Sequence, residues 1–273
     1  RINSKEIKKS DIFFAIKGKK NNGNKFVSEA FNKKASVAIV NTINKNNSRK
    51  NQVRVNDTLK FLTKISKIYR QNIDTRIIAI TGSCGKTTLK ELIGNSLKQL
   101  SKVSISPKSY NNKYGVPLSL FNLNPKDNYG VLEIGMDKKG EIDYLSKIVK
   151  PDVSVITNIS YAHVKNFKSI RQIALAKAEI INNTKDNGFI ILNADDNFFN
   201  MHKKIAIKRN LKILSFGIRN KNSNIKLINI KKEAKKYKAT IEVNKIKTHF
   251  LLKNDFQNNI LNILSTLTVM SIY

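Results

Sequence analysis

The sequence predicts an α/β fold, in which a small N-terminal α/β domain is followed by a P-loop-type central domain with a mostly parallel sheet flanked by helices. Three observations predict it. At about 150 residues per domain, 273 residues are enough for two domains. A hydrophobic content of 40% is enough for a packed core. Strand-like and helix-like patterns also alternate regularly after residue 75.

The first predicted domain comprises residues 1–74, where short apolar runs alternate with glycine and asparagine. Its predicted elements are, in order, a strand at Asp11–Ile16, a loop at Lys17–Asn24, a helix at Phe26–Lys34, a strand at Ser36–Val40 and a helix at Asp57–Gln71. The last helix has its apolar residues on one face, and Asn56 or Asp57 is its expected N-cap. We expect the domain boundary near Asn72–Thr75.

The central domain, residues 75–273, begins with alternating strand and helix patterns. The predicted strands are Arg76–Thr81, Tyr129–Ile134, Val153–Asn158 and Phe189–Asn193, and the predicted helices are Thr87–Leu100, Glu141–Ile148 and Ile170–Asn183. This alternation indicates a mostly parallel sheet with helices on both faces. Ligands of such sheets bind at the carboxyl ends of the strands.

From Ile213 to Leu252 the pattern changes to short strands without long helices between them. The strands expected there are Ile225–Ile230, Ala239–Val243 and Thr248–Leu252. An apolar helix is expected to start near Gln257.

The chain is strongly basic: 51 Lys and Arg against 19 Asp and Glu give a formal net charge of +32. The basic residues are 43 Lys and only 8 Arg, beside 36 Asn. Recognition of base edges and of phosphate favours Arg, and the aromatic residues do not alternate with the lysines in a stacking pattern. We therefore expect no nucleic acid partner. A nucleic-acid binder is the alternative, and it would bind DNA with a steep salt dependence.

Composition also argues against several classes of protein. No run approaches the ~18 apolar residues that a membrane span needs, and no apolar segment near Arg1 is typical of a signal peptide. The single cysteine excludes an internal disulfide framework and a zinc site made of several cysteines. We expect a cytoplasmic monomer without a membrane span.

The most informative segment joins a predicted buried strand to an amphipathic helix. Its residues are Gly82, Ser83, Cys84, Gly85, Lys86, Thr87 and Thr88. Glycines let backbone N–H groups approach phosphate oxygens, the helix N-terminus supplies positive potential, Lys86 neutralises charge, and Thr87 can ligate Mg²⁺. The segment is shorter than the common motif, because Gly82 comes only three residues before Gly85. The other interpretation is an ordinary strand–turn–helix corner, and Cys84 is interpreted as a spacer.

A lysine interrupts the apolar stripe of the predicted helix Ile170–Asn183. Lys177 lies seven residues after Ile170 and three after Ala174, on the face that is expected to meet the core. A lysine there must extend to solvent, meet an anionic partner or lose its charge through desolvation. A neutral amine can react with CO₂ to form a carbamate, which is an anionic oxygen ligand for a hard metal.

Two further metal-competent residues lie at the ends of predicted strands. Glu133 is a carboxylate in an otherwise apolar strand, and His163 follows the strand that ends at Asn158. Taken singly, a lone histidine is usually structural and a lone glutamate at a strand end often faces solvent. Together with the phosphate loop, they form a candidate Mg²⁺–nucleotide site with oxygen ligands and one imidazole.

Taken together and in order, these segments resemble the Mur ligase family, and within it the enzymes that add D-alanyl-D-alanine to UDP-MurNAc-tripeptide. The matching stretches are Asp11–Gly18, Thr81–Thr88, Asn111–Leu118, Leu132–Met136, Gly140–Ile142, Thr157–Ile159, Ala162–His163, Ala176–Ile180 and Asn193–Asp196. Asn111–Leu118 and Leu132–Met136 favour this type over the diaminopimelate- or lysine-adding members and over folylpolyglutamate synthetase. The resemblance covers the first two of the family's three domains, and the C-terminal domain lies outside these residues.

The resemblance implies an ATP-dependent amide ligase that works through an acyl phosphate with two Mg²⁺ ions. UDP-MurNAc-tripeptide and D-Ala-D-Ala would be its substrates. Lys86 would contact the β and γ oxygens of ATP. Thr87 and Glu133 would hold one Mg²⁺, and His163 with a carbamylated Lys177 would hold the second.

The resemblance also implies binding residues. The nucleotide-binding residues would be Gly82, Ser83, Cys84, Gly85, Lys86, Thr87, Thr88, Asn258 and Asn262, and the substrate-binding residues would be Ser4, Lys5, Asn111 and Asn112. The sequence departs from the family at some of these positions: Cys84 stands where the family usually has Asn, and Asn258 where it has His. Ser160-Tyr161 replaces a Gly-Pro pair.

Two other functions stay open at this point. One is a different ATP-dependent amide ligase of the same architecture, similar to folylpolyglutamate synthetase. The other is a non-catalytic nucleotide-binding module, which would hydrolyse ATP slowly without any acceptor.

Overall fold

The computed structural model describes residues 1–18, 21–161, 166–233, 236–252 and 259–273. Within these residues the chain forms two compact units, Arg1–Asn72 and Ile73–Tyr273, each with its own sheet. The predicted α/β class is confirmed in both units. None of the described helices is long and apolar enough to cross a membrane.

The first unit is built on a parallel sheet in the order β1-β2-β3. Its elements are β1 (Ile12–Phe14), β2 (Val37–Val40), β3 (Gln52–Arg54), α1 (Val27–Asn32), α2 (Thr58–Gln71) and 3-10 turns at Ser4–Glu6, Gly23–Phe26 and Arg49–Asn51. Phe13 of β1 and Val27 of α1 are buried in its core. Asp57 caps α2, because its Oδ1 accepts hydrogen bonds of 2.9 Å from the N–H groups of Leu59 and Lys60.

The second unit contains a nine-stranded sheet within the described residues. Its strands are β4 (Arg76–Thr81), β5 (Val103–Ile105), β6 (Tyr129–Glu133), β7 (Val153–Ile156), β8 (Phe189–Asn193), β9 (Lys212–Gly217), β10 (Ile225–Glu233), β11 (Lys236–Val243) and β12 (Ile246–Leu252). Their order is β12-β11-β10-β9-β8-β7-β4-β6-β5. Neighbours from β5 to β10 are parallel, whereas β10, β11 and β12 pair antiparallel. In β4, residues 77–81 are all buried, as expected for a strand with both faces covered.

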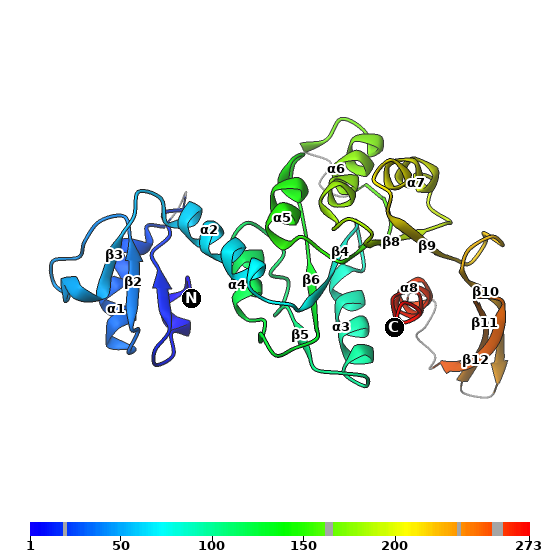
Figure 1. Ribbon diagram of the computed structural model, residues 1–273, viewed down its shortest axis with the longest axis horizontal. Coiled ribbons are helices and arrows are strands. Elements are labelled where there is room, and N and C mark those ends of the chain that lie inside the picture. Colours follow the sequence, from blue (N-terminus) through cyan, green and yellow to red (C-terminus); the bar gives the residue numbers. More distant parts are fainter. Residues whose placement is uncertain (19–20, 162–165, 234–235, 253–258) are drawn as a thin grey trace. The chain divides into compact units, whose positions relative to one another are not determined.

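Helices cover both faces of this sheet (Figure 1). They are α3 (Lys86–Leu97), α4 (Gly115–Phe121), α5 (Glu141–Val149), α6 (Ile170–Asn183), α7 (Phe199–Lys208) and α8 (Ile260–Met270). Helices α3 and α8 pack together on one face, and α5, α6 and α7 form a layer on the other. Ile80, Leu89, Ile93 and Leu264 are fully buried in the core between α3, α8 and the sheet.

Several elements differ from the expectation. β3, β5, α4, α7 and β9 have no predicted counterpart. β3 and β5 have only three residues each, too few for a periodic apolar pattern. Helix α4 contains Gly115 and Pro117, which normally indicate a turn. In α7 only His202 and Ala206 are buried, so its apolar stripe is weak. The expected helix start near Gln257 lies outside the described residues, and α8 begins at Ile260.

We predict that Ile93→Ala lowers the free energy of unfolding of the second unit by about 2–5 kcal/mol, because it opens a cavity under α3. The control is Ile207→Ala, which makes the same change at a helical position that is 56% exposed. It should shift stability by no more than about 0.5 kcal/mol. Urea denaturation followed by circular dichroism measures both, and equal losses would contradict the core described here.

Candidate functional site

The candidate site lies at the carboxyl ends of three central strands, β4, β6 and β7. From β4 the chain runs to β5 and β6 on one side and then crosses to β7 on the other. Loops that leave neighbouring strands in opposite directions open a crevice between them. The loop after β4 leads to Lys86, β6 ends at Glu133, and Asn158 follows β7.

The loop after β4 depends on two glycines with positive φ. Gly82 has a φ of +150°, and a Cβ added to it would lie 1.8 Å from Thr157 Oγ1. Gly85 has a φ of +80° and forms the N-cap of α3 without a side-chain cap. The loop can therefore approach β7 closely, and the first turn of α3 offers N–H groups for which a helix has no internal acceptor.

The tip of this loop is fastened to the segment after β7. The N–H of Ser83 donates to the carbonyl of Asn158 at 2.9 Å, and the N–H of Cys84 donates to Asn158 Oδ1 at 3.0 Å. The hydroxyl of Thr157 donates to the carbonyl of Cys84 at 2.9 Å. Cys84 thus contributes its backbone to the loop, and its thiol is free and exposed.

Two lysines meet at one carbonyl of the loop. Lys86 Nζ and Lys177 Nζ each donate to the carbonyl oxygen of Gly82 at 2.9 Å. Lys177 is only 2% exposed, so it does not extend to solvent. Burial, together with the neighbouring Lys86 ammonium, lowers the pKa of Lys177 to about 7. Lys177 could extend to solvent, meet an anionic partner or lose its charge through desolvation. The structure favours desolvation over extension to solvent.

A buried carboxylate faces the phosphate loop from β6. Glu133 is 2% exposed, and its Oε2 accepts a hydrogen bond of 2.7 Å from the hydroxyl of Thr87. Its Oε1 accepts a hydrogen bond of 2.7 Å from Asn111 Nδ2. Glu133 therefore joins the helix that follows the phosphate loop to the segment before α4.

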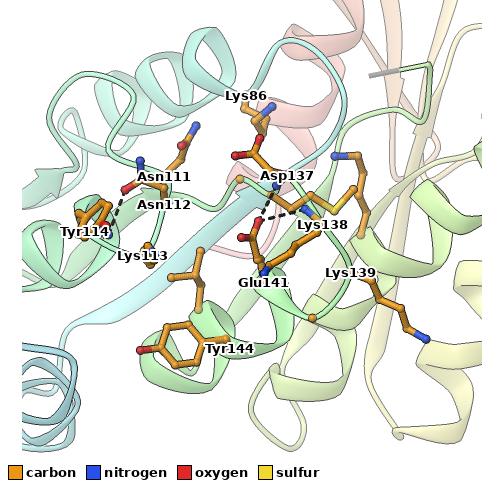
Figure 2. Close-up of a pocket in the computed structure, with 15 residues that line it drawn as sticks. Lys86, Asn111, Asn112, Lys113, Tyr114, Asp137, Lys138, Lys139, Glu141 and Tyr144 are labelled. Carbon is orange, nitrogen blue, oxygen red and sulfur yellow. Dashed lines mark hydrogen bonds between the residues drawn. The ribbon is translucent and has the colours of Figure 1, made fainter. Parts of the chain in front are cut away.

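A pocket of about 710 Å³ opens beside these groups and reaches both Lys86 and Lys177. Figure 2 shows one wall formed by Asn111, Asn112, Lys113 and Tyr114 and another formed by Lys138, Lys139, Glu141 and Tyr144. Its lining holds five lysines and two acidic residues. Glu141 Oε2 accepts hydrogen bonds from the N–H groups of Asp137 and Lys138 at 2.6 and 3.2 Å. The pocket is therefore suited to an anionic ligand.

Glu179, which is not among the predicted site residues, supports one wall of this pocket. Its Oε1 accepts a hydrogen bond of 2.8 Å from the N–H of Gly140, and its Oε2 accepts one of 3.0 Å from the N–H of Asp143. It caps the start of α5 from α6, two residues after Lys177. Its place in the stretch Ala176–Ile180 was the available signal.

Asp195 and Asp196 form a second support, at the end of β8. Asp195 accepts hydrogen bonds from the N–H groups of Ile218 and Asn220 at 2.6 and 2.8 Å. Asp196 Oδ2 accepts one of 2.7 Å from the N–H of Ile159, which follows β7. These two carboxylates hold loops in place near the site.

The structure describes some of the other predicted site residues and not others. Asn262 of α8 lies beside Gly85: its Oδ1 would be 3.2 Å from a Cβ added there. His163 and Asn258 lie outside the described residues. Ser4 is buried in the first unit and donates to Glu29 Oε2 at 2.9 Å, while Lys5 is exposed. Neither lines that unit's pocket of about 320 Å³, which is formed by Ile16, Lys17, Asn41, Asn56, Asp57, Thr58 and Leu59.

Known proteins are similar in sequence to most of this chain. The Mur ligase middle domain is matched over residues 80–270. A UDP-N-acetylmuramoyl-tripeptide–D-alanyl-D-alanine ligase of Rickettsia prowazekii is 36% identical over 226 residues, which are 82% of this chain and 50% of the relative. The chain spans about half the length of the curated relatives it matches.

Solved MurF structures are similar to this chain in fold. MurF from Acinetobacter baumannii superimposes with a TM-score of 0.89 at 29% identity, covering 99% of this chain and 58% of the other. MurF ligase from Thermotoga maritima, solved in complex with ADP, gives a TM-score of 0.87 at 30% identity and covers 100% and 62% of the two chains. With a middle-domain match over residues 80–270 and a relative that is 36% identical over 82% of this chain, the chain belongs to the Mur ligase family.

Proposed function

We propose that this chain is part of an ATP-dependent ligase that joins D-alanyl-D-alanine to UDP-MurNAc-tripeptide in the synthesis of peptidoglycan precursors. The observation that carries the proposal is the convergence of Lys86, Thr87 and Glu133 beside a lysine-rich pocket. The names of the relatives supply the identity of the substrates. Because the chain spans only part of those relatives, the reaction is proposed for the complete gene product.

The two units would bind different substrates. Residues 1–74 would bind the UDP part of the acceptor, and residues 75–273 would bind ATP. The pocket beside the N-terminus of α2 gives the first unit a place for a polar ligand. In the second unit, the open first turn of α3 and the neighbouring Asn262 give the nucleotide a place.

The chemistry would have two steps. The γ-phosphoryl group of ATP passes to the terminal carboxylate of the tripeptide, so that ADP leaves and an acyl phosphate forms. The amino group of D-Ala-D-Ala then attacks the acyl carbon, phosphate leaves, and the new amide loses a proton. Both steps gather negative charge, which fixed cations and N–H dipoles stabilise. Lys86 would turn from the Gly82 carbonyl to the β and γ oxygens, and Asn111 and Asn112 would orient the acceptor.

The donor set of the second unit fits a magnesium ion. Thr87 and Glu133 offer oxygen ligands that already lie 2.7 Å apart, with Glu133 buried and Thr87 half-buried. Among the described residues no three His, Cys, Asp or Glu side chains gather at one point. Mg²⁺ commonly takes one or two protein oxygen ligands and completes its shell with water and substrate phosphates, and the Thr87–Glu133 pair can supply those ligands. When bound, such an ion neutralises charge on the phosphate oxygens.

A second ion would need an anionic group at Lys177, and a carbamate would supply it. The amine is buried, is held at the Gly82 carbonyl, and has a pKa lowered to about 7 by burial and by Lys86. A neutral amine attacks CO₂ and releases one proton, and the neighbouring Lys86 ammonium favours the anion that forms. His163 would be the partner ligand.

The identity of the acceptor substrate distinguishes the proposed reaction from its alternatives. We expect phosphate release by the complete gene product to require ATP, UDP-MurNAc-tripeptide and D-Ala-D-Ala together. A coupled phosphate assay with a folate and glutamate pair as the control measures this. Release with the folate pair would identify a folylpolyglutamate synthetase-like enzyme, and slow release that no acceptor changes would identify a nucleotide-binding module.

We predict that Lys86→Ala weakens binding of Mg·ADP to this chain by at least about tenfold, because a charge-assisted hydrogen bond to phosphate is lost. In the complete gene product it should abolish ADP release that depends on both substrates. Lys98→Ala is the control, since it removes an exposed lysine at the other end of the same helix. Isothermal titration calorimetry measures the affinity, and equal affinities in both variants would remove Lys86 from the phosphate site.

We predict that Lys177→Ala is inactive in ligation and that short carboxylates such as acetate partly restore it. The carbamate itself should give a ¹³C NMR signal with labelled bicarbonate at pH 8 that is absent from Lys177→Ala. The signal should fall as the pH is lowered through about 7, because protonated amine does not attack CO₂. Full activity of Lys177→Ala without any carboxylate would contradict the proposal.

A further inference from the structure

Lys90 of α3 is a lysine without any exposed surface, one turn after Lys86. Its Nζ donates to the carbonyl oxygens of Ser106 and Lys108 at 2.7 and 2.5 Å. The carboxylate of Glu91 lies 3.2 Å from the same nitrogen. A buried ammonium is strongly unfavourable unless such partners compensate for its lost water.

The segment that Lys90 holds is the one that leads to the candidate site. Lys108 has a φ of +48°, a conformation that residues other than glycine rarely adopt, and its carbonyl is one of the two that face Lys90. The next residue, Ser109, has its hydroxyl 3.4 Å from the hydroxyl of Thr87. Asn111 follows with its hydrogen bond to Glu133.

These contacts form a closed network that begins and ends at α3. Lys90 joins α3 to the segment 106–108, Asn111 joins the same segment to Glu133, and Glu133 returns to Thr87 at the start of α3. Lys90 does not itself line the pocket, whereas Asn111, Asn112, Lys113 and Tyr114 do. An apolar residue would fill the same volume without the cost of desolvation but would leave both carbonyls without this donor.

We propose that Lys90 is a positioning residue, which holds segment 106–112 against α3 so that Asn111 contacts Glu133. The pocket wall formed by Asn111, Asn112, Lys113 and Tyr114 then keeps a fixed distance from the loop Gly82–Thr88. The local part of this proposal concerns the folded chain alone. Its kinetic part rests on the proposed ligase function.

The local part is tested by hydrogen exchange of this chain in the variant Lys90→Met. Amides in 106–112 should exchange at least about tenfold faster, while those of β4 and β6 stay protected. Lys98→Met, which removes the exposed lysine directly after the same helix, is the control and should change neither region. Unchanged exchange in 106–112, or an equal rise throughout the second unit, would overturn the proposal. If Lys90→Met does not fold, Lys90→Gln, which keeps a donor, is compared in the same way.

The kinetic part is tested in the complete gene product. Lys90→Met should raise the KM for UDP-MurNAc-tripeptide by about tenfold and change the KM for ATP by less than about twofold. In an Asn111→Ala background the same change should have much less effect, because the two residues act through one contact. If the effects of Lys90→Met and Asn111→Ala on this KM were additive, the proposed link between Lys90 and Asn111 would be wrong. Absence of ligation in the unmodified protein would refute the proposed function and leave the exchange result intact.

Discussion

The arrangement of the second unit depends on one buried carboxylate. Glu133 has lost nearly all contact with water, and two side chains that arrive from different elements satisfy it, Thr87 from α3 and Asn111 from the segment before α4. A carboxylate in this position is tolerated only while both donors stay in place. The hydrogen bonds therefore fix the phosphate loop, the end of β6 and the pocket wall relative to one another.

Close packing on the other side of the loop completes the frame. Gly82 lies so near Thr157 that no side chain fits between them, and the loop tip is fastened to Asn158 through both its backbone and its amide. Lys86 and Lys177 then meet at the Gly82 carbonyl. The Lys86 ammonium, beside the open first turn of α3, makes this corner attractive to anions in a way that a general lysine excess does not.

Much of this could be predicted from the sequence because it depends on local patterns. The strand, the glycines and the amphipathic helix around Gly82–Thr88 predict a phosphate loop, and the strand pattern before Glu133 predicts its place at a strand end. The position of Lys177 on an apolar stripe predicts an unusual lysine, but only the structure shows that it meets Gly82. The contacts of Lys90 and Glu179 could not be predicted this way, because their partners are backbone groups 16 and 39 residues away. For Glu179 the stretch Ala176–Ile180 indicated only that the region matters. Short elements such as β5 were missed since three residues carry no period.

The antiparallel end of the sheet has a consequence for the behaviour of the protein at high concentration. β12 is the last strand in the described sheet order, and its Ile246 and Leu251 are 72% and 64% exposed. An open strand edge with apolar side chains invites pairing with a second chain and the growth of aggregates. Lys245 and Lys247 stand at the start of this strand and are exposed. Charged side chains at a strand edge disfavour such pairing, so these two lysines oppose the association that the apolar side chains of β12 favour.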